Sequence, residues 1–279
     1  MMKAPVNKII PFSNVDGPGN RCAIFFQGCP FQCLYCHNPE TIHMCQHCGK
    51  CVSTCPTDAL SIKDNKVQWN VNTCIHCDTC IQVCDYLSSP KIQWMQVEDI
   101  IAILKKNRIF LRGITVSGGE CMMHASFLLE LFKEAKALGL TCLIDSNGYY
   151  DFEQYPELMN ICDGVMLDVK AVNSDYHKQL TGNTNDIVLK NLHYLLSIDK
   201  LEEVRTVILP DMDEQNEQTV RYVSKLLKEK SRYKLIRYRK YGVREEGLNI
   251  LGETNVTLSY IEQYQDLCRE NGNTTSIII

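Results

Sequence analysis

The sequence predicts an α/β fold, in which a partial barrel of about six strands is interrupted near its start by a small cysteine-rich domain. Apolar runs and helical patterns alternate from about residue 96 onward, which favours a parallel sheet covered by helices. Eleven of the sixteen cysteines fall between residues 29 and 84, so this part of the 279-residue chain has a separate composition. Hydrophobic residues make up 45% and charged residues 22%, which excludes wholesale disorder.

The predicted elements follow in chain order. Residues 21–27, RCAIFFQ, predict a buried strand, because an apolar run with β-branched and aromatic members ends at Gly28. By their apolar spacing, helices are expected over residues 96–107, 125–139, 153–160, 186–198, 216–230 and 257–271. Further strands are expected over residues 113–120, 140–148, 162–170, 202–210 and 232–242, and residues 274–279 predict another strand or a contact segment.

Polar motifs follow several of these strands. SGGE ends at Glu120, DSNG at Gly148, DVK at Lys170 and RYRK at Lys240. The carboxyl ends of parallel strands are where barrels and open sheets gather their sites. We therefore expect these motifs to converge.

Composition and charge exclude several classes of function. A formal net charge of −4 gives no general attraction to nucleic acid or to anionic membranes. The first residues lack a secretory apolar core, and no apolar run reaches the roughly 18 residues of a membrane span. A cytoplasmic protein without nucleic-acid or membrane partners is expected. In a reducing compartment, closely spaced cysteines indicate metal ligands rather than disulfides.

Two runs in the cysteine-rich segment share the spacing C-x2-C-x2-C-x3-C. This duplicated spacing is the signature of a two-cluster bacterial ferredoxin, where the fourth cysteine of each run ligates the other cluster. The sequence therefore predicts one 4Fe-4S cluster on Cys45, Cys48, Cys51 and Cys84, and a second on Cys74, Cys77, Cys80 and Cys55. A pair of zinc sites is the alternative, although zinc does not need two tandem runs. The inserted domain is expected to span residues 40–90, within a barrel formed by residues 1–39 and 91–279.

Cys29, Cys33 and Cys36 have a different spacing, C-x3-C-x2-C. Three thiolates on a 4Fe-4S cluster leave one iron open, and an open metal position can bind substrate or cofactor. The alternative is that Cys45 completes an ordinary closed cluster, but the ferredoxin pattern already uses Cys45.

The segment CPFQCLYC, with Tyr35 before its last cysteine, resembles the signature of radical S-adenosylmethionine (SAM) enzymes. The upstream NVDGPGNRCAIFFQGC and the downstream HNP are similar to glycyl-radical-enzyme activating enzymes, the pyruvate formate-lyase activating enzyme group. The ferredoxin insert is similar to that of the longer activases, and the compact length, SGGECM and RYRKYGVR resemble the YjjW-type subgroup in particular. Activases for glycerol dehydratase, choline lyase and hydroxyphenylacetate decarboxylase are also similar.

The resemblance implies three 4Fe-4S clusters, bound SAM and a redox function. SAM would be cleaved reductively to methionine and a 5′-deoxyadenosyl radical, which takes a hydrogen from one glycine of a partner glycyl radical enzyme. A flavodoxin or ferredoxin-type protein would be the reductant. One rival hypothesis is a radical SAM enzyme acting on a small molecule or another peptide, and a second is a polyferredoxin electron carrier without catalysis.

The resemblance also implies roles for individual residues. Asp16 would contact the substrate's glycine loop, and Asp145, Met166 and Asp168 match positions that bind a monovalent cation in some activases. The residues implied to contact SAM are Tyr35, Gly118, Gly119, Glu120, Asp145, Ser146, Asp168, Lys170, Arg205 and Arg239.

Each of these motifs also has an ordinary structural interpretation. SGGE can be a strand-to-helix turn, DSNG an Asx turn, Asp168 and Lys170 a solvated ion pair, and the basic run near Arg239 an exposed face. Cys121 stands where the family usually has a proline.

Overall fold

The computed structural model describes residues 2–279, which form one nine-stranded sheet and one separate hairpin. Six neighbouring strands of the large sheet are parallel to one another. They are β2 (Arg21–Phe26), β6 (Gly113–Gly118), β7 (Thr141–Ser146), β8 (Gly164–Asp168), β9 (Leu201–Ile208) and β10 (Arg232–Arg237). The six predicted parallel strands are therefore confirmed.

Three more strands extend this sheet at its two sides. β11 (Ile277–Ile278) pairs in parallel with β10, so the end of the chain is a strand. On the other side, β1 (Ala4–Ser13) runs antiparallel to β2, and β5 (Gln93–Met95) runs antiparallel to β1. The strand order of the described residues begins at β11 and ends at β5 without closure, so the barrel is partial.

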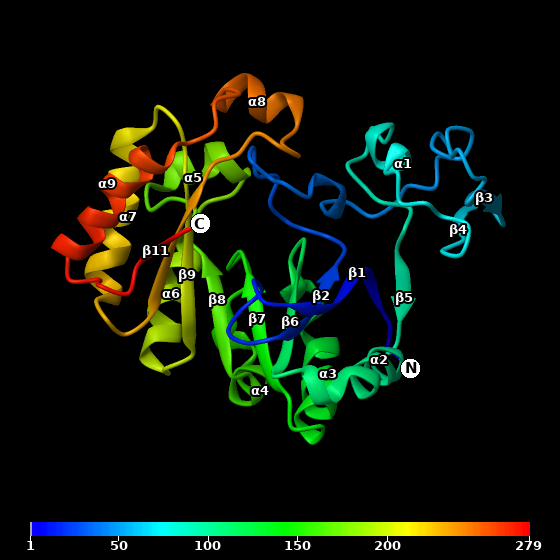
Figure 1. Ribbon diagram of the computed structural model, residues 1–279, viewed down its shortest axis with the longest axis horizontal. Helices are drawn as coiled ribbons and strands as arrows, with labels where there is room; N and C mark the ends of the chain where they lie inside the picture. The colour runs from blue at the N-terminus through cyan, green and yellow to red at the C-terminus, as the bar shows by residue number, and fades with distance from the viewer. Residues whose placement is uncertain (1) are drawn as a thin grey trace.

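Helices cover the outer face of the sheet, as Figure 1 shows, with α6, α7 and α9 beside β9 and β11 and with α2 and α3 beside β6. The helices are α2 (Val97–Asn107), α3 (Ala125–Ala137), α4 (Pro156–Ile161), α5 (Ser174–Thr181), α6 (Asp186–Ser197), α7 (Asp213–Leu227), α8 (Glu245–Leu251) and α9 (Leu258–Glu270). Four short 3-10 helices are η1 (Pro39–Thr41), η2 (Arg108–Phe110), η3 (Cys121–His124) and η4 (Phe152–Gln154). Residues 174–181 and 245–251 were not expected to be helical.

Alternation along the strands separates the core from the site. In β7, Cys142 and Ile144 are fully buried in the main hydrophobic core beneath the helices. Asp145 lies on the opposite face of the strand, because successive side chains of a strand point to opposite sides. There it accepts a hydrogen bond from Ser117 of β6. The inner face of the sheet is thus the polar face.

The cysteine-rich insert has elements and a core of its own. The chain leaves the barrel after η1 and returns at β5, and between them it forms the hairpin β3 (Leu60–Lys63) and β4 (Lys66–Trp69) and the short helix α1 (Thr79–Gln82). Leu60, Val67, Cys51 and Cys80 form a hydrophobic cluster separate from the main core. Figure 1 shows this segment projecting beyond β1 and β5. The boundaries at residues 40 and 90 stay a prediction.

None of the helices formed by residues 2–279 combines the length and apolarity that crossing a membrane requires.

Candidate active site

The loop that carries Cys29, Cys33 and Cys36 begins directly after β2. Backbone hydrogen bonds hold it from two sides: the Cys29 amide donates to the Ile42 carbonyl (2.9 Å) and the Leu34 amide donates to the Leu180 carbonyl (2.9 Å). Burial and then the charge of Cys33 raise the pKa of Cys36 to about 11, and the charges of Cys33 and Cys36 also act on the pKa of Cys29, so the three thiols lie close enough to interact. The loop is therefore fixed at the carboxyl end of the sheet with its thiols gathered.

Gly118 and Gly119 allow the SGGE turn to lie against this loop. A Cβ on Gly119 would stand 2.2 Å from the Gly28 carbonyl oxygen, and a Cβ on Gly118 would stand 2.2 Å from the backbone of Phe26. Real Cβ atoms do not come so close to backbone, so only glycine fits at these two positions. The Glu120 amide then donates to the Gly28 carbonyl at 2.7 Å. The glycines position the cysteine loop.

The Glu120 carboxylate joins two strand ends. It is 1% exposed and accepts hydrogen bonds from the Met122 amide (3.0 Å), the Ser146 hydroxyl (2.9 Å) and the Asn147 amide (2.8 Å). Burial raises the pKa of the Glu120 carboxyl to about 7, although these donors oppose the shift. Both carboxylate oxygens and the Ser146 hydroxyl are thus engaged inside the protein. A contact from this turn to SAM would have to come from its backbone.

Cys121, like Glu120, joins the ends of β6 and β7. Its side chain is fully buried, and its thiol lies 3.3 Å from the Asp145 carbonyl, to which it donates. A proline at this position could make no such bond. The thiol ties the turn after β6 to the end of β7.

Lys170 lies where the end of β8 meets the cysteine loop. Its ammonium is 2.9 Å from the Asp168 carboxylate and 5.6 Å from the centre of the Tyr35 ring. Burial alone would lower the pKa of Lys170, but the charges of Asp168, Tyr35 and Cys33 hold it well above its usual range. The Lys170 side chain is 11% exposed, so the pair is not a solvated surface contact. A largely buried cation therefore lies close enough to Cys33 and Cys36 to lower the pKa of both thiols, against the larger effect of burial.

A second charged group lies deeper on the inner face. The Arg205 guanidinium of β9 contacts Asp145 (2.9 Å), Glu203 (2.7 Å) and the sulfur of Met166 (3.1 Å). Burial opposes its charge, yet the carboxylates around it raise the pKa of Arg205 above its usual range. Lys234 pairs with Glu203 at 2.9 Å. The carboxylates of this layer are all balanced by side-chain cations.

The segment after β10 covers the cysteine loop. Arg244 donates to the carbonyls of Gln32 (3.1 Å) and Cys33 (3.4 Å), and a Cβ on Gly247 would stand 1.9 Å from the Leu34 carbonyl oxygen. Arg239 is exposed and reaches the loop through its carbonyl, 2.9 Å from the ring nitrogen Nε2 of His37. The structure therefore does not bring the Arg239 side chain to the other predicted SAM contacts.

Asp16 lies at the other end of β2 from the cysteine loop, in the turn between β1 and β2. Its carbonyl accepts a hydrogen bond from Thr115, and Gly17 beside it faces Leu143 and Arg21. Because six strand residues span about 20 Å, Asp16 is far from the SAM set. It borders the amino-terminal end of the barrel.

The insert brings its thiols into two groups. One small cavity is lined by Cys55, Cys74, Cys77 and Cys80, the set predicted for one cluster. In the other set, burial and then the charges of Cys80, Cys45 and Cys84 raise the pKa of Cys51 to about 11. Cys84 thus lies close enough to Cys45 and Cys51 to act on the pKa of both thiols.

Among residues 2–279, no three His, Cys, Asp or Glu side chains lie close enough together to hold a single metal ion. The donor sets of the insert are all sulfur, which both iron-sulfur clusters and four-cysteine zinc sites use.

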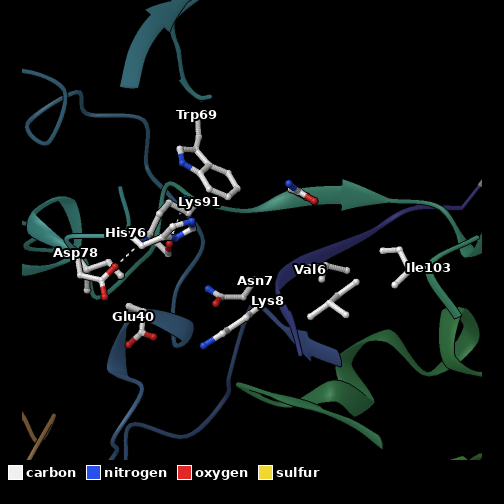
Figure 2. Close-up of a pocket in the computed structure, with 13 residues that line it drawn as sticks. Val6, Asn7, Lys8, Glu40, Trp69, His76, Asp78, Lys91 and Ile103 are labelled. Carbon is white, nitrogen blue, oxygen red and sulfur yellow. Dashed lines mark hydrogen bonds and ion pairs between the residues drawn. The ribbon is translucent and has the colours of Figure 1, made fainter. Parts of the chain in front are cut away.

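A hollow of about 570 Å³ lies between the insert and the barrel edge. Figure 2 shows Trp69, His76 and Asp78 of the insert on one side and Asn7 and Lys8 of β1 on the other. It is lined by charges of both signs and does not reach the cysteine loop at residues 29–36. It is separate from the candidate active site.

Comparisons with known proteins agree with this geometry. Residues 23–226 match the family model of the radical SAM superfamily. The pyruvate formate-lyase-activating enzyme of Streptococcus mutans is 32% identical, over 85% of this chain and 78% of its own length. A Haemophilus influenzae protein provisionally named a glycyl-radical enzyme activating enzyme is 32% identical, over 93% of both chains.

The chain belongs to the radical SAM superfamily, among the glycyl-radical-enzyme activating enzymes.

One further relative supports this membership, and one solved structure supports the fold. The trans-4-hydroxy-L-proline dehydratase activating enzyme of Clostridioides difficile is 32% identical over 72% of each chain. The structure of Streptococcus suis SuiB bound to precursor peptide SuiA superposes with a TM-score of 0.56 at 13% identity, over 91% of this chain and 47% of SuiB. That likeness concerns the fold alone, an α/β fold with a mostly parallel sheet.

Two residues near the thiols of this activating enzyme were not among the predicted site residues. The Asn147 side-chain amide lies 3.4 Å from the Cys29 sulfur, and Arg244 donates to the Cys33 carbonyl. Asn147 was visible in DSNG but was interpreted as part of a turn. Arg244 stands five residues after Arg239, and no sequence pattern there indicates that this segment folds over the loop.

Proposed function

We propose that this activating enzyme carries its catalytic 4Fe-4S cluster on Cys29, Cys33 and Cys36 and holds SAM with Lys170 and the neighbouring strand ends. When bound, this cluster supplies the electron that cleaves SAM to methionine and a 5′-deoxyadenosyl radical, which removes a hydrogen from a glycine of the partner enzyme. The Lys170 ammonium beside the thiols is the observation that carries the proposal.

Lys170 suits the methionyl carboxylate of SAM. Its buried ammonium already lies against the Tyr35 ring and near Cys33, and a charge-assisted bond is stronger in a site that excludes water. The Asp168 carboxylate pairs with the same ammonium. Because Asp168 lies at the end of β8, it can also accept a hydrogen bond from a ribose hydroxyl. The Ser117–Glu120 turn offers backbone groups to the methionyl amine. Residues 29–36 and 168–170 thus position SAM without acid-base chemistry.

Asp145, Met166 and Asp168 are also the proposed ligands of a monovalent cation. In the structure the Arg205 guanidinium lies against Asp145 and Met166. A cation could therefore bind there only if Arg205 moved, for example toward the bound SAM. The Ser146 hydroxyl is bonded to Glu120 and the Arg239 side chain is exposed, so both side chains would need to reorient to contact SAM.

We propose that the insert carries two further 4Fe-4S clusters with crossed ligation, as in a bacterial ferredoxin. The cavity lined by Cys55 with Cys74, Cys77 and Cys80, and the proximity of Cys84 to Cys51, support this assignment. Cys51 and Cys80, one from each set, pack in the same small core. The two clusters would therefore be neighbours and could relay an electron from a flavodoxin or ferredoxin-type reductant toward the barrel.

The partner would present its glycine to the open inner face of the barrel. Asp16 borders the amino-terminal end of this face, so we propose it as a contact to the partner's glycine loop rather than to SAM. The subgroup is proposed to be YjjW-type, because the insert and the RYRKYGVR segment occur together.

The test is activation of a partner. Reduced, reconstituted protein is incubated with SAM and a glycyl radical enzyme without oxygen, and the glycyl doublet is sought by electron paramagnetic resonance. A doublet that requires both proteins supports the proposal. SAM cleavage without a doublet for any candidate partner would favour a radical SAM enzyme with another substrate.

Iron counting separates the proposal from a polyferredoxin carrier. Three 4Fe-4S clusters require about twelve irons per chain, and two require about eight. About eight irons together with an absence of SAM turnover would contradict the proposed catalytic cluster.

A further inference from the structure

Asn147 is the side-chain amide that points at a predicted cluster ligand. It follows β7 and is 7% exposed, and its Nδ2 lies 3.4 Å from the Cys29 sulfur. This distance is within hydrogen-bonding range for a sulfur acceptor, which is larger and softer than oxygen. The Cys29 sulfur therefore has the Asn147 side-chain amide as a hydrogen-bond donor.

The surroundings of Asn147 fix the orientation of its amide. Its Oδ1 accepts from the Tyr149 backbone amide at 3.0 Å, and its own backbone amide donates to Glu120 at 2.8 Å. If the side-chain amide were flipped, the Tyr149 amide would face an NH2 group and the Cys29 sulfur would face an oxygen. The orientation with Nδ2 toward the sulfur is thus the one that satisfies every group.

The Asn147 residue also connects the Cys29 sulfur to Glu120, a buried carboxyl group of the SGGE turn. Asn147 binds Glu120 through its backbone and Cys29 through its side chain. It therefore links the buried Glu120 side chain to the Cys29 sulfur, and its side-chain amide is held in place to donate to that sulfur.

We propose that Asn147 is a positioning residue that sets the reduction potential of the cluster on Cys29 through its hydrogen bond to the sulfur. Reduction adds negative charge that the thiolates share, so a donor at a thiolate stabilises the reduced form more than the oxidised form. The midpoint potential is therefore higher with Asn147 than without it. The inference rests on the proposed function in one respect, that Cys29 ligates the catalytic cluster.

The experiment is a redox titration of the reconstituted full chain, followed by electron paramagnetic resonance with and without SAM. Only a cluster with an open iron changes its spectrum when SAM binds, so this change isolates the Cys29 cluster from those of the insert. Asn147→Asp is the main variant, because its carboxylate still accepts from Tyr149 and keeps the turn. Asn147→Ala removes the donor without adding charge.

The control is Asn183→Ala. The Asn183 amide donates to the Pro30 carbonyl at 3.0 Å, so it holds the same loop but touches no sulfur. A variant that only loosened the loop would affect both positions alike.

We expect Asn147→Ala to lower the reduced-to-oxidised ratio at a fixed potential about tenfold, which is a midpoint about 59 mV more negative. Asn147→Asp should lower it further, and Asn183→Ala should leave it unchanged. Equal midpoints in wild type and both Asn147 variants, or an equal shift in Asn183→Ala, would overturn the inference alone. A wild-type protein without a SAM-sensitive signal would overturn the proposed function and this inference together.

Discussion

Replacement of Gly119 by alanine tests whether the SGGE turn positions the cysteine loop. The new Cβ would stand 2.2 Å from the Gly28 carbonyl oxygen and 2.8 Å from the Thr41 carbonyl oxygen. Ordinary contacts begin near 3.4 Å, so the backbone of Gly28 has to retreat by about 1 Å. Cys29 is the next residue, and its sulfur moves with that backbone.

Two magnitudes follow from this displacement. Forcing a methyl group into a packed site costs about 2 kcal/mol, which lowers the Tm by roughly 4–8 °C in a chain of this size. A misplacement of about 1 Å at a reacting centre costs on the order of 100-fold in rate. The 2.7 Å hydrogen bond from the Glu120 amide to Gly28 would also lengthen.

The assay measures 5′-deoxyadenosine formation by chromatography, with the Tm from circular dichroism. Gly272→Ala is the matched control, because Gly272 has φ of +85° and nothing within 4 Å of its Cβ position. The free energy of unfolding of Gly272→Ala should fall by about 1 kcal/mol, because alanine disfavours this positive φ. Its rate of 5′-deoxyadenosine formation should equal that of wild type. If Gly119→Ala formed deoxyadenosine within twofold of wild type, the close approach would not position the loop.

Three other predictions test the remaining parts of the site. Lys170→Met should raise the Kd for SAM about tenfold to a hundredfold by loss of a charge-assisted bond, and an unchanged Kd in equilibrium dialysis would contradict the role of Lys170. With crossed ligation, the double alanine variant at Cys45 and Cys84 should lose about four of twelve irons, whereas the double variant at Cys80 and Cys84 should lose about eight; the reverse result would show that each run holds its own cluster. The cluster-free protein should become less stable as pH rises from about 4.5 to 7, because burial raises the pKa of Glu120 to about 7 and the folded state holds that proton more tightly than the unfolded chain. The effect is up to about 3 kcal/mol in denaturant titrations, and the same pH slope in Glu120→Gln would argue against Glu120 as its source.

The parallel core of the fold could be predicted because its strands are short apolar runs between helical patterns. β1 was not predicted, because APVNKIIPFS contains two prolines and lacks a regular alternation of apolar and polar residues. Both features argue against a strand. It forms nevertheless because β2 and β5 offer pairing partners on both sides. Partners that are distant in sequence decided its structure.

The candidate site could be predicted as a set of thiols and strand ends, but the direction of each side chain could not. SGGE shows two glycines and an acid, yet only the fold shows that the Glu120 carboxylate turns inward to Ser146 and Asn147. Likewise, nothing in the sequence places Arg205 against Asp145 and Met166, since these residues lie on three different strands.

The contacts between the segment after β10 and the cysteine loop also constrain how the protein matures during synthesis. Arg244 reaches Gln32 across 212 residues of chain, which a ribosome needs roughly 10 to 40 s to make. The insert, in contrast, has all its thiols within residues 45–84 and is complete early. Iron delivery to the nascent polypeptide can therefore begin in the insert, whereas the catalytic cysteines acquire their final enclosure only when translation is nearly finished.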